Sequence, residues 1–239
     1  MEKLAEIQPM QTTQLIPNQP LALQLAKRDL SLLVYDAVNL EGVAMTLPEV
    51  QTILDGITVG GHKISDQTMA VNQAKAWELL FEMVKTGRFR FDKATALEIH
   101  QVAAQDEALD WGKFRTGFVT ISGSDYEPPA PETLDEHWIA LEASLHKITD
   151  VYDRAITAFL QMARVQFFWD VNKRTGRFMM NGILLAQGYP IINVPAKRQQ
   201  AFNQLMLDFY SDNDMIAMNA FLRSCLDQRL LRNFVTVAG

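Results

Sequence analysis

Apolar residues recur at helical spacing along most of this chain. The first stripe runs from Leu21 to Ala37 and is followed by Gly42, a residue type that commonly ends a helix in the left-handed conformation. We therefore predict one helix from Leu21 to about Gly42. Similar stripes predict further helices over residues 46–56, 67–86, 94–104, 134–167, 174–187, 196–210 and 212–225.

One segment has the pattern of a β-strand instead. Residues 118–121 read Phe-Val-Thr-Ile, and the next four residues, Ser-Gly-Ser-Asp, favour a turn. We expect a small β-hairpin flap at this point. A single hairpin is too little for a sheet-based domain, so the predicted fold class is all-α with one β-hairpin.

Composition limits the kinds of protein that this chain can be. It has 239 residues, of which 48% are apolar, enough for one sizeable core. Its 28 acidic and 22 basic residues give a net charge of -6, which argues against a nucleic-acid partner bound through a broad positive field. The single cysteine, Cys225, excludes an internal disulfide framework.

The start of the chain has no pattern of a targeting or membrane segment. Residues 1–20 are polar, contain three prolines and predict a poorly ordered arm. No apolar run approaches the roughly 18 residues that a membrane span needs. We expect a cytoplasmic protein with no membrane partner.

Candidate chemistry is concentrated between two predicted helices, from Asp170 to Arg177. Free N–H groups and the positive end of the helix dipole make the start of a helix an anion site. Arg174 and Arg177 are three residues apart and can reach one anion together, and Lys173 adds a third cation. Asp170 is an oxygen ligand suited to Mg²⁺ bound with phosphates. The alternative is a solvated basic helix start that Asp170 caps.

The four histidines are weaker candidates. His62, His100, His137 and His146 are scattered and lack the spacing of a zinc site. His100 and His146 lie in helical patterns, which favours a partly buried structural role over that of a base. The alternative is that one of them swings into the site between residues 170 and 177 and acts as the base there.

The order of residues in the loop resembles the signature of the Fic/Doc family, His-x-Phe-x-Asp/Glu-Gly-Asn-Gly-Arg-x-x-Arg. Five positions agree: Phe168, Asp170, Asn172, Arg174 and Arg177. Residues 112–115 and 119–129 also resemble the entry loop and the target-docking flap of that family. The resemblance divides the chain into an arm (1–20), a helical extension (21–90), a Fic-type core (91–225) and a C-terminal tail (226–239).

This resemblance implies a particular ligand set. ATP would be bound by Asn172, Lys173, Arg174, Gly176 and Arg177, with Mg²⁺ on Asp170. The activity implied is transfer of AMP to a hydroxyl of a protein substrate docked along the flap near residues 118–127. A homodimer is left open.

The sequence departs from the signature at the catalytic position. Gln166 stands where the family has its histidine, and an amide cannot accept a proton near neutral pH. Loss of a general base would slow transfer by about 10²–10⁴-fold. The alternative is a pseudoenzyme whose site binds nucleotide or a protein partner without transfer.

Two further departures lie in the loop. Val171 replaces a glycine, which limits the backbone if that position needs a positive φ. Lys173 replaces the second glycine, so the run Asn-Lys-Arg-Thr resembles the Doc branch, which transfers phosphate. Gly176 and Arg177 follow the AMP-transferring branch instead. The transferred group is therefore left open between AMP and phosphate.

Glu41 and Gly42 resemble the inhibitory motif of the family, Ser/Thr-x-x-x-Glu-Gly/Asn, with Ala37 at the hydroxyl position. In that motif the glutamate pairs with the second arginine of the signature. We hypothesise that Glu41 pairs with Arg177 and has a regulatory role. The alternative is that Glu41 is a surface acid before a helix-ending glycine.

Overall fold

The computed structural model describes residues 15–235. Within that range every regular element is helical, which confirms the predicted all-α class. The α-helices are α1 (Gln19–Arg28), α2 (Leu30–Leu40), α3 (Leu47–Leu54), α4 (Ile64–Lys85), α5 (Lys93–Ala103), α6 (Leu134–Leu145), α7 (Val151–Val165), α8 (Asn172–Ala186), α9 (Gln199–Asp212), α10 (Ile216–Arg223) and α11 (Gln228–Leu231). Short 3₁₀ turns are η2 (Pro131–Thr133), η3 (Ala196–Arg198) and η4 (Arg232–Phe234).

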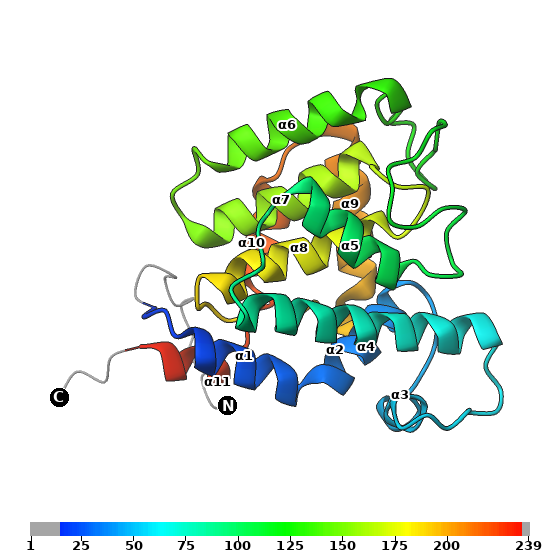
Figure 1. The fold of residues 1–239 in the computed structure, drawn as a ribbon, viewed down its shortest axis with the longest axis vertical. Coiled ribbons are helices and arrows are strands. Elements are labelled where there is room, and N and C mark those ends of the chain that lie inside the picture. The colour runs from blue at the N-terminus through cyan, green and yellow to red at the C-terminus, as the bar shows by residue number, and fades with distance from the viewer. Residues whose placement is uncertain (1–14, 236–239) are drawn as a thin grey trace, which may run out of the picture.

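Helix α8 lies at the centre of the molecule (Figure 1). It packs along α7 and also contacts α4 and α5. Of its 15 residues, 12 are buried, so it is enclosed on nearly all sides and has no broad solvent face. Because the first turn of α8 carries the predicted phosphate-binding cations, the packing of this helix fixes where those charges lie.

Gly176 allows α7 and α8 to approach closely. A Cβ atom at this position would lie 3.0 Å from Phe159 Cδ2 and 3.1 Å from the backbone oxygen of Phe159. The backbone of a packed helix cannot move aside as a flexible side chain can. We expected Gly176 to contribute to nucleotide binding, and the structure gives it a packing contact with α7.

Two predicted helices are each divided in two. The helix predicted from Leu21 to Gly42 is interrupted at Asp29, which separates α1 from α2. The helix predicted over residues 134–167 stops at Leu145, and Asp150 begins α7 by accepting the backbone N–H of Asp153. An aspartate of low helix propensity stands at each break, a local effect that the apolar stripes do not reveal.

The predicted β-hairpin at residues 118–127 is wrong, since none of the described residues forms a strand. The turn itself is present, because the N–H of Ser124 donates to the carbonyl three residues earlier at 3.1 Å. The buried guanidinium of Arg115 donates to the carbonyls of Gly117 and Pro129, at 2.7 Å and 2.5 Å. The side chain of Arg115 is therefore hydrogen-bonded to carbonyl groups on both sides of the segment. Pro128 and Pro129 at its end have no N–H group with which to pair two strands. The flap is an irregular arch.

Apolar residues of the predicted extension and of the predicted core share one buried cluster that runs from Leu15 to Phe234. Part of the predicted arm belongs to it, since Leu15 is buried and the N–H of Ile16 donates to the carbonyl of Phe234 at 2.6 Å. Residues 1–14 of the arm and 236–239 of the tail lie outside the described residues. Among the described helices, none combines the length and the apolar character needed to cross a bilayer.

The contact at Gly176 gives a test of the packing. Gly176→Ala should lower the free energy of unfolding by about 1–3 kcal/mol, because the added methyl group overpacks the α7–α8 interface. The matched control is Gly60→Ala, where a Cβ would meet no atom within 4 Å and where we expect a change within about 0.5 kcal/mol. Urea denaturation measures both. Equal midpoints for the two variants would contradict the packing role.

Candidate functional site

The loop between α7 and α8 turns sharply at both of its ends. Gln166 ends α7 with φ 54° and Val171 begins α8 with φ 61°, so both are in the left-handed region that favours glycine. The second is a β-branched residue, for which this conformation costs roughly 1–2 kcal/mol. The structure therefore requires a positive φ where the signature has glycine and this chain has valine.

The side chain of Asn172 holds the loop in this shape. Its Oδ1 accepts the N–H of Phe168 at 2.9 Å, and its Nδ2 donates to the carbonyl of Phe168 at 2.8 Å and to Gln166 Oε1 at 2.9 Å. Both amide protons of this buried side chain are thus used inside the protein. Asn172 is a brace of the loop as well as part of the cavity wall described next.

A cavity of about 440 Å³ lies over the loop, within the range of small-molecule sites. The predicted site residues on its wall are Glu41, Gln166, Asp170, Asn172, Lys173 and Arg174. Thr120, Ile121 and Ser122 of the arch form another side, and Asn203, Met206, Leu207 and Tyr210 of α9 complete it. Gly176 and Arg177 are not on this wall: the former packs against α7, and the latter lies behind Glu41.

The start of α8 opens into this cavity. The first amides of a helix have no carbonyl partner within the helix, and the helix dipole adds partial positive charge there. Lys173 and Arg174 contribute full charges at the same end. The geometry is therefore suited to an anion with several oxygens, such as a phosphate chain.

Glu41 partly neutralises these cations. Its Oε1 lies 3.2 Å from Arg177 Nη2, and its Oε2 lies 3.5 Å from Lys173 Nζ. The structure thus contains the Glu41–Arg177 pair that the sequence predicts. Burial by itself would raise the pKa of the Glu41 carboxyl, but Lys173, Arg177 and Arg174 together hold this pKa below its usual value. Glu41 is therefore an anion that occupies the cation cluster.

A second carboxylate, Glu107, was missed by sequence reasoning. Its Oε2 accepts a hydrogen bond from Arg174 Nη1 at 2.7 Å, and side-chain exposures of 10% and 5% make this a buried ion pair. Glu107 follows α5 and is separated from Arg174 by 67 positions. No local pattern joins two residues so far apart, so only the fold reveals this pair.

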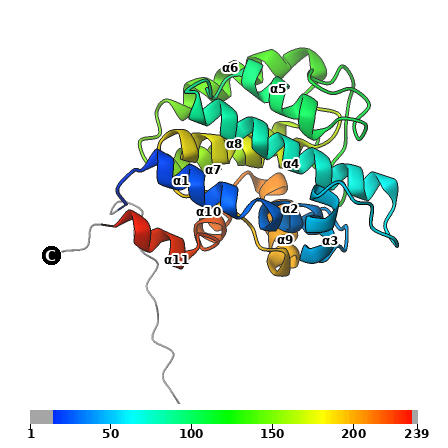
Figure 2. The same ribbon diagram turned by 60° about the horizontal axis from the view of Figure 1, so that its bottom comes forward.

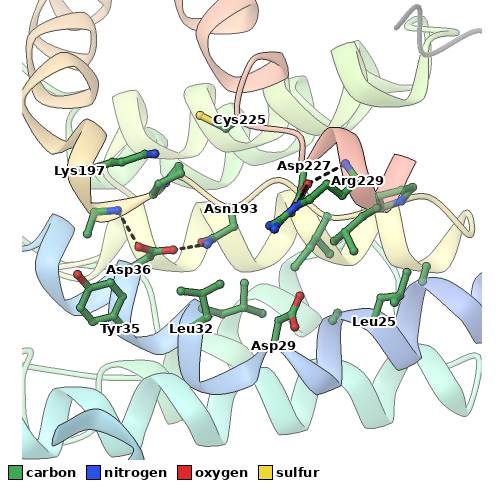
Figure 3. A pocket seen from close by; sticks show the side chains of 18 of the residues that line it. Leu25, Asp29, Leu32, Tyr35, Asp36, Asn193, Lys197, Cys225, Asp227 and Arg229 are labelled. Carbon is green, nitrogen blue, oxygen red and sulfur yellow. Dashed lines mark hydrogen bonds and ion pairs between the residues drawn. The ribbon is translucent and has the colours of Figure 1, made fainter. Parts of the chain in front are cut away.

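Helix α2 is anchored firmly enough to hold Glu41 in place. The buried carboxylate of Asp36 accepts hydrogen bonds from Asn193 Nδ2 at 2.5 Å and from the N–H of Ala196 at 2.7 Å (Figure 3). Burial raises the pKa of this carboxyl in spite of both bonds. Near the end of α2, Gln199 Nε2 at the start of α9 donates to the carbonyl of Asn39 at 2.6 Å. Helix α2 also contacts η3, which leads into α9, and Figure 2 shows α2 close to this end of α9.

The side-chain amide of Gln166 is hydrogen-bonded inside the protein at both its nitrogen and its oxygen. Its Nε2 donates to the carbonyl of Ala163 at 2.5 Å, and its Oε1 accepts from Asn172. Arg115 Nε donates to its carbonyl at 2.6 Å and so fixes its backbone. The side chain is therefore engaged within the loop, and it has no titratable base.

His100 does not replace the missing base. The N–H of Gly112 donates to its Nδ1 at 3.1 Å, and its Nε2 lies 3.2 Å from the carbonyl of Asp170. A carbonyl only accepts, so the proton is on Nε2 and the ring is neutral. Burial lowers the pKa of His100 to about 4, and its ring is stacked on Phe168. His100 is a support beneath the loop.

Asp170 is the one carboxylate of the loop. It is exposed, and its Oδ1 accepts the N–H of Val171 at 2.6 Å. Across residues 15–235 no cluster of three or more His, Cys, Asp or Glu side chains could hold a metal by itself. Asp170 fits Mg²⁺ only as a single protein ligand, with phosphates and water supplying the other oxygens.

Comparisons with known proteins point to one family. Residues 90–184 match the Fic/DOC family model. The protein adenylyltransferase Fic of Drosophila virilis is 26% identical over 210 residues, which cover 82% of this chain and 41% of the relative. This chain therefore spans about two fifths of the length of that relative.

Solved structures show the same fold. Fic-1 from C. elegans aligns with a TM-score of 0.76 at 20% identity and covers 87% of this chain and 64% of that one. A Fic domain-containing signalling protein from Bacteroides thetaiotaomicron aligns with a TM-score of 0.70 at 18% identity, covering 91% and 88%. The molecule has a Fic-type helical fold. The match to the Fic/DOC family model lies within this fold, at residues 90–184.

The strained position gives a test of the loop. Val171→Gly should be more stable than Val171→Ala by about 1 kcal/mol, because both lose the same packing and only glycine relieves the left-handed strain. At Val34, which is buried in the interior of α2, the order should reverse, since alanine is favoured over glycine in a helix interior by about 1 kcal/mol. Thermal unfolding of the four variants measures the differences. The same order at both sites would contradict strain at Val171.

His100 gives a pH test. Its pKa of about 4 in the folded protein lies below the value of about 6.5 in the unfolded chain. Between these pH values the unfolded chain binds the extra proton, so the free energy of unfolding falls by about 3 kcal/mol as pH drops from 6.5 to 4. His100→Gln should lose this part of the acid dependence. Urea denaturation at pH 7, 5.5 and 4.5 compares the two proteins, and parallel pH profiles would contradict the assignment.

Proposed function

We propose that this protein binds ATP in the cavity over the α7–α8 loop and transfers AMP to a hydroxyl of a protein substrate. The main support for this proposal is the start of α8, where Lys173 and Arg174 line a cavity of about 440 Å³. The carboxylate of Glu41 forms ion pairs with Lys173 and Arg177 there, so the protein itself already places an anion at this point. The adenylyltransferase names of the curated relatives support the same choice.

In this reaction the substrate hydroxyl oxygen bonds to the α-phosphorus of ATP. The bond from that phosphorus to the bridging oxygen breaks, and pyrophosphate leaves. The hydroxyl proton goes to solvent, because Gln166 cannot take it. The cations of α8 stabilise the charge on the phosphates in the transition state. Magnesium held by Asp170 would neutralise part of the phosphate charge when bound.

Glu41 is the proposed gate of this site. Glu41 is part of the cavity wall and forms an ion pair with Arg177. The guanidinium of Arg177 is buried, and its Nη1 has no hydrogen-bond partner. A phosphate oxygen could reach Arg177 only if this carboxylate moved aside. Removing the carboxylate should therefore strengthen ATP binding. The substrate protein would dock along the arch at residues 118–127 and so bring its hydroxyl to the cavity, since Thr120 to Ser122 border the cavity.

The second candidate function is nucleotide binding without transfer. It is favoured by one observation, the engagement of the Gln166 amide by Ala163 and Asn172. In this case the site would be a sensor of nucleotide, and the missing base would have no consequence for its role. Transfer of phosphate in the manner of the Doc branch is the third candidate, supported by the run from Asn172 to Thr175.

Intact-mass spectrometry after incubation with ATP and Mg²⁺ tests these functions. We expect Glu41→Gly to gain the mass of one AMP faster than the wild type, and Glu41→Gly/Gln166→His to gain it about 10²–10⁴-fold faster than Glu41→Gly alone. A gain equal to one phosphate would indicate the phosphotransferase. ATP-dependent thermal stabilisation with no mass gain in any variant would indicate the sensor.

Asp55→Gly is the matched control. Asp55 ends α3 with φ -76° and ψ 3°, close to the φ -86° and ψ 6° of Glu41, and each is followed by a glycine of positive φ. It is exposed and should leave ATP binding unchanged. Absence of any ATP-dependent thermal shift in the wild type, Glu41→Gly and the double variant would overturn the proposed function.

A further inference from the structure

Two glutamates contact the cations of α8 from different sides. Glu41 comes from the end of α2 and lines the cavity, so it lies where a ligand would lie. Glu107 contacts Arg174 but does not contribute to the cavity wall. Arg174 does line the cavity, so Glu107 can act on a ligand there through its contact with this arginine.

Glu107 is itself held from behind. Asn72 on α4 donates through Nδ2 to Glu107 Oε1 at 3.2 Å and to the carbonyl of Gln105 at 2.7 Å. Asn72 is buried, as are most of its neighbours on the inner side of α4. The carboxylate therefore has one oxygen on the amide of Asn72 and the other on Arg174, which fixes both its position and its orientation.

Arg174 is bound by Glu107 at one nitrogen only. Nη1 makes the ion pair, while Nη2 and Nε are not among the buried side-chain nitrogens that lack a partner. The guanidinium is planar and presents its donors as a rigid fork. Fixing Nη1 on Glu107 therefore also fixes the direction of the remaining donors, and Arg174 is one of the residues that line the cavity over the loop.

We propose that Glu107 is a positioning residue, which holds the guanidinium of Arg174 so that its remaining donors face the cavity and bind a phosphate of the nucleotide. This inference rests on the proposed function and extends it to a residue outside the family signature. It gives the two glutamates opposite roles, because Glu41 competes with the phosphate and Glu107 prepares its binding.

The proposal predicts that ATP binding weakens when Glu107 is removed, whereas simple electrostatics predicts that it strengthens. Removing any negative charge near the cations should strengthen the binding of an anion. Orientation prevails here because an arginine that is only 5% exposed cannot remain buried without a carboxylate. Without Glu107 the guanidinium would turn toward another acid, and Glu41 is already close enough to Arg174 for the two charges to interact. In the wild type such a turn would strengthen the gate. With Glu41 removed, the guanidinium would still lose the acceptor that fixes its direction, and its donors would no longer be held toward the cavity.

The test uses Glu41→Gly as the background, so that the gate is absent. In this background Glu107→Gln should weaken ATP binding about tenfold, the loss expected when one charge-assisted hydrogen bond is misdirected. Binding of adenosine, which has no phosphate, should change by less than about twofold. Titrations followed by nuclear magnetic resonance measure both affinities. A purely structural role would weaken the two ligands alike.

Glu98→Gln in the same background is the matched control. It removes an Arg–carboxylate pair with Arg88 on the surface, at 2.7 Å and with both side chains about half exposed. ATP affinity should be unchanged. Asn72→Ser provides a second variant that keeps the Glu107 charge and removes only its support, and it should also weaken ATP binding while leaving adenosine binding as it was.

The outcomes separate this inference from the proposed function. If Glu41→Gly binds ATP and Glu107→Gln binds it equally well or more tightly, charge prevails over orientation and the positioning role is overturned. Equal weakening of ATP and adenosine also overturns it. If Glu41→Gly itself shows no ATP binding, the proposed function fails and the positioning role fails with it.

Discussion

The interior position of α8 imposes the main constraint on this molecule. The helix is central and mostly buried, yet its first turns carry Arg174 and Arg177. A buried guanidinium is stable only with an acceptor of opposite charge. The fold meets this requirement with Glu41 from α2 and Glu107 from the segment after α5, so three distant parts of the chain are joined at one point.

This arrangement explains why the site is both suited to phosphate and closed to it. The cations are present, the helix start faces the cavity, and the same cations are already paired with carboxylates. Glu41 lines the cavity, whereas Glu107 contacts Arg174 without lining it, so the proposed nucleotide would have to displace only Glu41. Asp36 and Gln199 hold α2 against the segments around α9, so displacement of Glu41 calls for movement of its side chain and not of the whole helix.

In the loop before α8, hydrogen bonds to the backbone offset the strain of a left-handed valine. Asn172, Arg115 and His100 each hold part of the loop backbone, and this support is strong enough to keep Val171 in a left-handed conformation. The loop is held in this shape in a chain that has neither the glycine nor the histidine of the signature. A rigid loop and a proton acceptor are separate requirements of the proposed transfer, and Gln166 supplies no acceptor.

The sequence by itself determined the helical class, which depends on periodicity, and its short motif led to the Glu41–Arg177 contact that the structure contains. It failed on the breaks at Asp29 and at residues 146–150 and on the hairpin, where local hydrogen bonds and the side chain of Arg115 prevail over the apolar pattern. Only the tertiary structure decided that Glu107 meets Arg174 and that Gly176 serves packing. Both depend on contacts between residues far apart in the chain, which no local spacing encodes.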